Sequence, residues 1–314
     1  MTSNTEGTFQ VVDKRRSHVV DHPGRRAVPA GWRAHSVLLG YFNSDYARRF
    51  LKDKALQSEL TEELMQQREF AQARMQSLLP FNMTKSSARP LTDDKSIAEI
   101  NRVMARPECQ GAYPEGTWTP ELVEISTLIP VQPSLDLDYA GGLGDSDLDP
   151  SKPTSAVSLC FAEKHPTDFH VSVEESQKAI TISGINPSLE VVGLHYEQEA
   201  NNGPVMLSFM VSPAPNIVVV ARYSGRHLLV SGYHRVYRLM QLGFTHFPCI
   251  VREAQTIAQI AIRGRAMFAE SVLMAQRPPL FPDFADPVLG IVVPFKEVHR
   301  VVRIRPDEYF VAKQ

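Results

Sequence analysis

Apolar and polar positions change their spacing several times along the chain, most sharply between residues 227 and 251. The runs 227–230 and 247–251 have the length of buried strands. Between them, from Tyr233 to Gly243, apolar residues recur at helical spacing with polar residues on the opposite side. The pattern predicts a strand, a tight turn at Gly232, an amphipathic helix and a second strand in the same sheet.

The amino-terminal part has a helical pattern. Apolar residues recur every three or four positions from 44 to 78, which predicts a long amphipathic helix, with a break near Glu59 as an alternative. Such a helix would either cross its own domain or pack against a partner, including a second copy of the chain. A shorter helix is expected at 93–104. Residues 1–40, rich in charge and turn residues, are expected to be flexible.

Short β-favouring runs fill the middle of the chain. Strands are predicted at 156–161, 179–183, 190–196, 205–211 and 217–221. We interpret the part from about 140 to 210 as an insertion that enlarges a sheet. The acidic stretch 136–153 offers oxygen atoms for calcium but lacks the glutamate that ends a twelve-residue calcium loop, which favours an acidic surface loop. Three histidines in this region, His165, His170 and His195, lack regular metal-ligand spacing.

The carboxyl-terminal part predicts one helix and two strands. The helix is expected at 255–274, before Arg277-Pro278-Pro279, and the strands at 290–294 and 298–304. We expect residues 277–314 to form an extension that packs on the same core. The last strand concentrates positive charge at His299, Arg300, Arg303 and Arg305. Such a strip either contacts phosphate or nucleic acid, or protects a sheet edge from pairing, and we prefer the second interpretation.

Composition narrows the classes of partner. The 33 basic and 35 acidic residues give a net charge of -2, so nucleic acid is not an expected partner. Three cysteines, Cys109, Cys160 and Cys249, form no metal-ligand pattern, and an odd count is typical of a reducing compartment. We expect them to be buried apolar groups. Because no apolar run has the length of a membrane span, we expect no membrane contact and a cytoplasmic location.

The turn at Gly232 is the most informative candidate for chemistry. A helix N-terminus presents backbone N–H groups and a partial positive charge, both of which favour phosphate. The guanidinium of Arg235 would add a fork of donors, and His234 another donor. Gly232 would let a ligand approach the backbone. The alternative is a solvated surface pair. The predicted phosphate-binding set is Ser231, Gly232, Tyr233, His234, Arg235 and Arg238.

Residues 228–251 resemble the core motif of the ParB/sulfiredoxin superfamily. In this chain the turn reads Ser231-Gly232-Tyr233-His234-Arg235, whereas ParB proteins have Gly-Glu-Arg-Arg and sulfiredoxins have Gly-Cys-His-Arg. The stretch 122–130 is similar to the strand that opens ParB domains. The resemblance implies an α+β fold over residues 121–276, with a mixed sheet and flanking helices. It also implies a nucleoside triphosphate, with magnesium, bound at the turn.

Departures from the family restrict the chemistry. Tyr233 stands where sulfiredoxins have their catalytic cysteine, so sulfiredoxin activity is not expected. Tyr233 also replaces the ParB glutamate, and its ring could fill the ligand space. Arg235 alone is shared with both families. Glu270 is the nearest equivalent of the downstream ParB Glu-Asn element, and no helix-turn-helix pattern follows Gln276.

The sequence therefore predicts a helical region at 41–120, a ParB-like domain at 121–276 and the extension at 277–314. Three functions remain open. The first is a nucleotide- or phosphate-binding module with a regulatory or scaffolding role. The second is a nucleotide hydrolase or phosphotransferase, in which His234 is the catalytic acid or base and Glu270 positions the metal. The third is DNA binding, which the overall charge disfavours. No dedicated metal site is expected.

Overall fold

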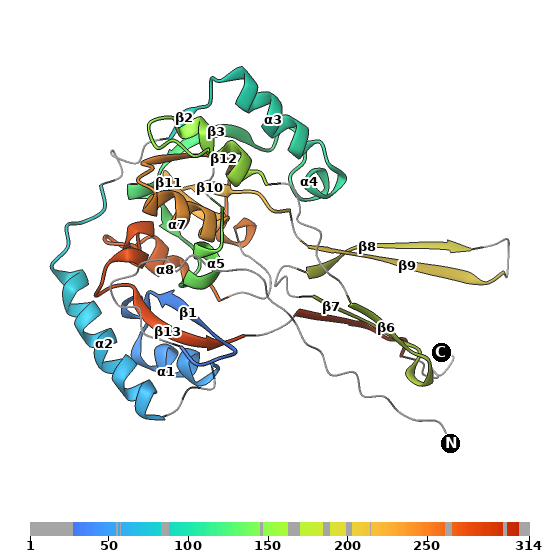
Figure 1. Ribbon diagram of the computed structural model, residues 1–314, viewed down its shortest axis with the longest axis horizontal. Coiled ribbons are helices and arrows are strands. Elements are labelled where there is room, and N and C mark those ends of the chain that lie inside the picture. Colours follow the sequence, from blue (N-terminus) through green and yellow to red (C-terminus); the bar gives the residue numbers. More distant parts are fainter. Residues whose placement is uncertain are drawn as a thin grey trace.

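The computed structural model describes residues 28–54, 56, 58–82, 88–144, 147–162, 170–184, 189–198, 203–213, 215–260, 266–297 and 300–307. A body of mixed α and β structure carries two β arms that project from one side (Figure 1). The predicted α+β class is thereby confirmed.

A six-stranded sheet lies at the centre of the body, in the order β2-β3-β12-β10-β11-β4. Its strands are β2 (Ala88–Pro90), β3 (Thr119–Glu124), β4 (Ile129–Pro130), β10 (Val219–Tyr223), β11 (Arg226–Ser231) and β12 (His246–Glu253). Helix α7 (Tyr233–Gln241) connects β11 to β12, as the spacing predicts. These two strands are not neighbours, because β10 lies between them, antiparallel to β11 and parallel to β12. Positive φ angles at Ser224 and Gly225 close the tight turn that pairs β10 with β11.

A second sheet joins the two ends of the chain to its middle. It has the order β13-β1-β5 and consists of β1 (Trp32–Val37), β5 (Ser134–Asp136) and β13 (Ile291–Lys296). The expectation of a flexible segment over 1–40 is wrong for β1, which pairs on both edges. Residues 1–27 lie outside the described part. Strand β13, in the carboxyl-terminal part of the chain, pairs with β1 in this sheet.

Helices cover these sheets. Their bounds are α1 (Ser44–Lys52), α2 (Ser58–Gln76), α3 (Asp94–Met104), α4 (Pro107–Ala112), α5 (Leu137–Gly141), α6 (Val157–Cys160) and α8 (Glu270–Leu273). Short 3-10 turns are η1 (Leu39–Tyr41), η3 (Ile125–Thr127), η4 (Pro153–Ala156), η5 (Glu175–Gln177), η6 (Ile257–Gln259) and η7 (Phe281–Ala285). The helix predicted at 44–78 is divided into α1 and α2, close to the alternative break. The helix expected at 93–104 is present, and Asp93 caps it by accepting from the Ser96 amide.

Three local expectations are wrong. The strand predicted at 156–161 is the turn η4 followed by α6. The helix predicted at 255–274 contains only η6 and α8 among its described residues, because a capping box between Thr256 and Gln259 closes a 3-10 turn. The acidic loop predicted from residue 136 begins instead with α5, since the Asp136 carboxylate accepts from the Tyr139 amide and starts a helix.

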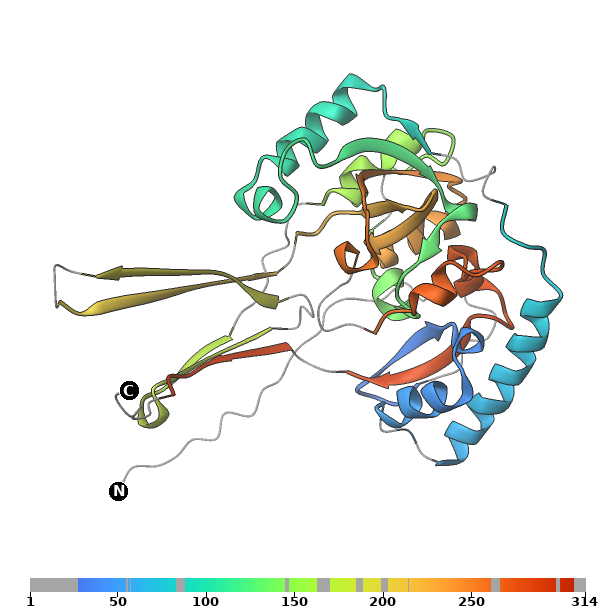
Figure 2. The same ribbon diagram turned by 180° about the vertical axis from the view of Figure 1, so that it is seen from behind.

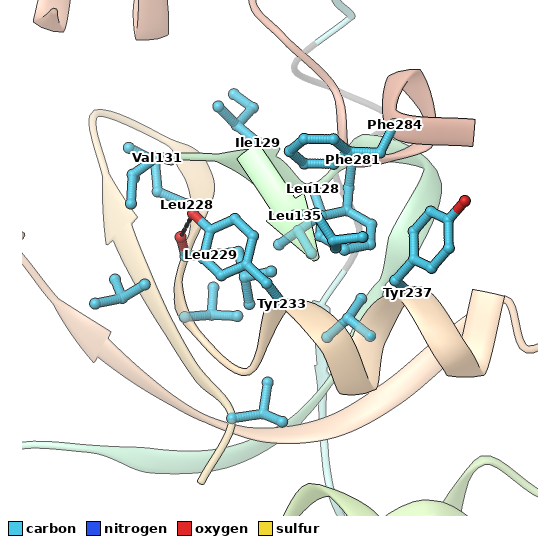
Figure 3. Packing of buried hydrophobic residues seen from close by; sticks show 14 of the residues in the cluster. Leu128, Ile129, Val131, Leu135, Leu228, Leu229, Tyr233, Tyr237, Phe281 and Phe284 are labelled. Carbon is cyan, nitrogen blue, oxygen red and sulfur yellow. Dashed lines mark hydrogen bonds between the residues drawn. The ribbon is translucent and has the colours of Figure 1, made fainter. Parts of the chain in front are cut away.

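One apolar core fills the space between the sheets. Tyr233 and Tyr237 from α7 meet Phe281 and Phe284 from η7 there, next to strands β4 and β11 (Figure 3). The three cysteines are buried, as expected. The buried carboxylate of Asp283 lies beside this core and anchors two other segments. It accepts from the Arg277 guanidinium at 2.8 Å and from the Tyr41 hydroxyl at 2.7 Å. Burial, and then the charge of Asp283, raise the pKa of Tyr41, so its hydroxyl remains a donor.

The arms are formed by the predicted insertion and the last strand. One arm is a three-stranded sheet of β14 (Arg300–Ile304), β7 (Ala179–Gly184) and β6 (His170–Glu174), and the other is a hairpin of β8 (Leu189–Gln198) and β9 (Val205–Pro213). Both views show the arms extending away from the body (Figures 1 and 2). The insertion therefore does not enlarge the central sheet. The terminal strand also leaves the core, because it pairs with β7.

Substitution of Asp283 by alanine is expected to lower the free energy of unfolding by about 3–5 kcal/mol, because the partly buried guanidinium of Arg277 would lose its carboxylate partner. Urea unfolding of the purified chain measures this difference. Glu62→Ala is the matched control, since Glu62 pairs with Arg48 on the exposed surface. That change is expected to cost less than about 1 kcal/mol. Equal losses in the two variants would contradict the assignment of Asp283 as an anchor.

Candidate functional site: the corner between β11 and α7

The turn at Gly232 has a left-handed backbone, which favours glycine at this position. Its φ angle is 96°, and it precedes the first residue of α7. A Cβ atom at this position would lie 2.6 Å from Val218 Cγ2 and 3.0 Å from Val218 Cα. The close approach that requires glycine is therefore made by the segment that leads into β10.

Tyr233 fills the inner side of the same corner. Its side chain is buried, and its hydroxyl donates to the Leu229 carbonyl at 2.7 Å (Figure 3). The same oxygen accepts from the Gln132 amide at 2.8 Å. These bonds link the end of β11 to the segment that follows β4. The ring thus has the space-filling role that its position in the motif suggested.

Arg235, the residue shared with both families, is also turned inward. It is only 5% exposed, and its Nη1 donates to the carbonyl oxygens of Asn216 at 2.6 Å and Cys160 at 3.2 Å. Burial lowers the pKa of this guanidinium. Its contacts connect α7 to the end of α6 and to the segment before β10. The expected orientation of Arg235 towards a ligand is therefore not the one observed.

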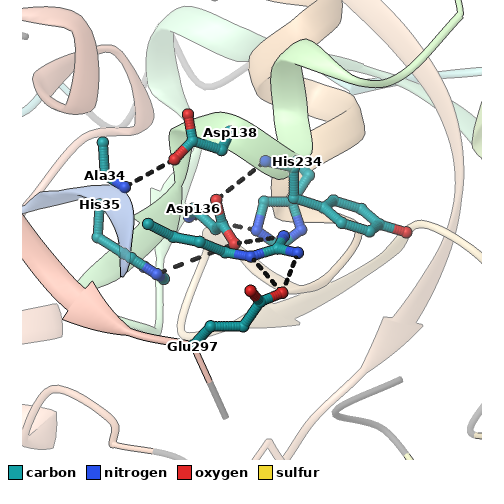
Figure 4. A network of polar contacts seen from close by, with 8 residues as sticks. Ala34, His35, Asp136, Asp138, His234 and Glu297 are labelled. Atoms are coloured by element: carbon teal, nitrogen blue, oxygen red, sulfur yellow. Dashed lines mark hydrogen bonds and ion pairs between the residues drawn. The ribbon is translucent and has the colours of Figure 1, made fainter. Parts of the chain in front are cut away.

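His234 points to the opposite side of α7, into a polar cluster. Its Nε2 accepts from the Asp136 amide at 3.3 Å, and its ring centroid lies 4.7 Å from that of Tyr139. The Asp136 carboxylate accepts from Arg33 Nη1 at 3.4 Å. Arg33 Nη2 also donates to the Glu297 carboxylate at 2.6 Å (Figure 4). The cluster thus brings together β1, the start of α5 and the start of α7, with the end of β13 contributing Glu297 at its edge.

His35 is the member of this cluster that sequence reasoning missed, because residues 1–40 were interpreted as flexible. Its ring stacks on Phe295 at 4.1 Å, and its Nε2 lies 3.9 Å from Asp136 Oδ2. No hydrogen-bond partner within the described structure reaches its buried Nδ1. Burial lowers the pKa of His35 to about 4, although Asp136 acts in the opposite direction. The ring is therefore neutral at physiological pH.

The charges around His35 and His234 are unfavourable for an anion. Asp138 adds a further carboxylate, which accepts from the Ala34 amide at 2.8 Å. Together with Asp136 and Glu297 it outweighs the positive charges of Arg33 and Lys54. Phosphate would have to displace a carboxylate from Arg33 to bind here.

The other predicted site residues are distributed unevenly. Ser231 ends β11 and Arg238 lies on α7, so both remain near the corner. Glu270 instead accepts from the Tyr223 hydroxyl, at the end of β10 that pairs with the start of β11. The length of β11, roughly 3.3 Å per residue, separates it from Gly232. The structure therefore does not bring Glu270 together with the corner.

The remaining candidates have local roles. In the terminal strip, Arg303 pairs with Glu174 at 2.8 Å and Arg305 lies 3.6 Å from Asp307. His195 lies 3.1 Å from Glu197 on β8. His165 and His299 fall outside the described residues. Across the described residues, no group of three or more histidine, cysteine or acidic side chains is arranged to hold a metal ion.

Comparison with family models, with curated proteins and with solved structures gives no match to this chain. A search of the described helices for one with both the length and the apolar character of a bilayer span likewise finds none.

Gly232→Ala is expected to destabilise the fold by about 3–5 kcal/mol, because backbone strain adds to a clash with Val218. Gly243 provides a matched control: its φ is 88°, and nothing lies within 4 Å of the position of its Cβ. Gly243→Ala should therefore show the strain alone, about 1–2 kcal/mol. Denaturant unfolding of both variants measures the difference, and equal losses would mean that Val218 does not pack tightly on the corner.

A second prediction concerns pH. Since the folded-state pKa of His35 lies near 4 and its ordinary value is 6.5, the unfolded chain takes up this proton first as the pH falls. The contribution of His35 is complete above about pH 6.5 and decreases towards pH 4, by about 3–4 kcal/mol at most. Unfolding of the parent and of His35→Gln across this range should show a difference that shrinks with acidity. A difference that is constant with pH would contradict a buried neutral ring.

Proposed function

We propose that this chain is a regulatory or scaffolding module built around a ParB-like corner in which Arg235 has an architectural role. The observation that carries this proposal is the position of Arg235, buried and bonded to the Asn216 and Cys160 carbonyls. A phosphate-binding arginine needs to face the space where phosphate lies. At this corner Val218 packs against Gly232, and the Tyr233 hydroxyl is bonded to the backbone, which supports an architectural role.

The resemblance to ParB proteins supports the fold part of the proposal. The two stretches that carry the resemblance, 122–130 and 228–251, come together in one sheet. Val123 lies opposite Phe247, and Leu122 lies opposite Pro248, in the antiparallel pairing of β3 with β12. The same sheet positions β11, and through it the start of α7.

Binding of a nucleotide or phosphate at residues 231–238 is the alternative form of this module. It would require α7 to present its amino-terminal amides while Arg235 left its carbonyl partners. Magnesium would enter only with the nucleotide, because the described residues form no metal site of their own. DNA binding has the weakest support, since the arginines at 303 and 305 lie beside carboxylates.

Acid–base chemistry on a phosphate ester is a second candidate function, and one specific observation favours it. His35 and His234 lie on either side of Asp136, and the buried Nδ1 of His35 has no hydrogen-bond partner within the described structure. A neutral imidazole next to a carboxylate can take up a proton, but a pKa near 4 makes His35 a weak base at neutral pH. The surplus of carboxylates around it is the argument against an anionic substrate.

Calorimetric titration with ATP, CTP and GTP, each with magnesium, separates these functions when combined with a phosphate-release assay. For the scaffolding module we expect no saturable binding and no turnover. Arg235→Met should reduce the melting temperature, because a buried cation with two carbonyl bonds is replaced by an unbonded thioether.

Arg238→Met, on the same helix, is the control for the loss of an arginine from α7. Saturable nucleotide binding that Arg235→Met abolishes, in a variant shown to be folded, would overturn the architectural role. Phosphate release that is lost in both His35→Gln and His234→Gln would instead establish the enzymatic alternative.

A further inference from the structure

Exposed apolar side chains gather on the two arms. Most of the large apolar side chains that are exposed in the described part of the chain lie there, rather than on the body. Those with more than half of their surface exposed on the arms are Val171, Val173, Leu194, Tyr196, Val205, Met206, Leu207, Met210 and Val301. Exposed apolar side chains that gather on one part of a protein mark a candidate surface for a partner.

The β8–β9 hairpin exposes such side chains on both faces. Leu194 lies opposite Phe209 and Tyr196 lies opposite Leu207, so these four residues share one face. Met206 and Met210 lie on the other face, because side chains alternate along a strand. An isolated two-stranded ribbon is only marginally stable in water. The hairpin therefore gains stability from any partner that extends it.

The two edges of this hairpin differ. Strand β8 has a register shift between Val191 and Gly193, carries the charged Glu197, and contacts β14 of the other arm. These features hinder pairing with a further strand. Strand β9 has a continuous register with β8 and contains no charged residue. Among the described strands, β8 alone pairs with it. Over residues 205–211 its outer edge lacks the charges, bulges and prolines that prevent strand addition.

We propose that β9 pairs antiparallel with β9 of a second copy of the chain, which joins the two hairpins into one four-stranded sheet. An uncharged strand pairs with itself without placing like charges opposite each other, whereas β8 would bring carboxylates together. Strand addition supplies main-chain hydrogen bonds in addition.

Side-chain alternation also restricts the register. The two apolar faces stay continuous only if odd-numbered residues of one copy lie opposite odd-numbered residues of the other. With Ser208 on the twofold axis, Leu207 lies opposite Phe209 of the second copy, and Met206 lies opposite Met210 of the second copy. Each contact then occurs twice, as an isologous interface requires.

Light scattering coupled to size-exclusion chromatography of the full chain, over a dilution series, tests the proposal. We expect twice the chain mass of 35.1 kDa for the parent. The double variant Met206→Lys/Met210→Lys should elute at the single-chain mass, because two pairs of like charges would face each other. The double variant Met206→Glu/Met210→Lys should recover the doubled mass, because each glutamate would face a lysine of the second copy.

Phe70→Lys is the control, since Phe70 is 70% exposed on α2 and belongs to the other surface predicted to bind a partner. It should leave the doubled mass unchanged. Circular dichroism checks folding, which these changes should not affect because Met206 and Met210 lie outside the core.

Several outcomes would overturn the proposal. The first is a parent chain that has the single-chain mass at every dilution. The second is a doubled mass that persists in Met206→Lys/Met210→Lys. The third is a Met206→Glu/Met210→Lys variant that does not recover the doubled mass. A single-chain parent that floats with phosphatidylcholine vesicles would assign the apolar hairpin to a lipid surface instead. Loss of the doubled mass in Phe70→Lys alone would assign association to α2.

Discussion

Gly232 lies against Val218 with no room for a side chain, and this contact fixes the point at which β11 ends and α7 begins. The rest of the body is arranged around it. Val218 precedes β10, the strand between β11 and β12, so the contact sets how closely α7 approaches the sheet. Tyr233 and Arg235, the first and third residues of α7, then extend the anchorage to Leu229, Gln132, Asn216 and Cys160. Arginine at such a turn is suited to phosphate, but here Arg235 donates to carbonyl groups of the protein's own backbone.

The sequence predicts the strand–turn–helix–strand unit because two apolar runs of strand length flank a segment with the 3.6-residue helical repeat. It does not predict which groups occupy the turn. Val218 reaches Gly232 through the β10–β11 hairpin, and the carbonyl partners of Arg235 come from segments 19 and 75 residues away. Such long-range contacts leave no trace in local spacing. The motif shows that an arginine lies three positions after the glycine, but the direction of the arginine side chain depends on the fold.

Two other errors have different physical origins. Strand β1, Trp-Arg-Ala-His-Ser-Val, contains polar residues at buried positions, and Ser36 is buried because its hydroxyl donates to the Phe284 carbonyl at 2.7 Å. Polarity alone therefore concealed a core strand, and with it His35. The region 255–274 has a helical repeat of apolar residues, but the side chain of Gln259 accepts from the amides of Gln255 and Thr256 and closes a short turn. Local side-chain bonds overrode the periodicity there.

The cysteines have a practical consequence for handling the protein. Cys109, Cys160 and Cys249 are all buried, and burial raises the pKa of Cys160 to about 12 and that of Cys249 well above its ordinary value. Thiols in this state are poor nucleophiles towards maleimides and iodoacetamide. A single cysteine introduced on the surface could therefore carry a fluorophore or spin label while the native thiols stay in place.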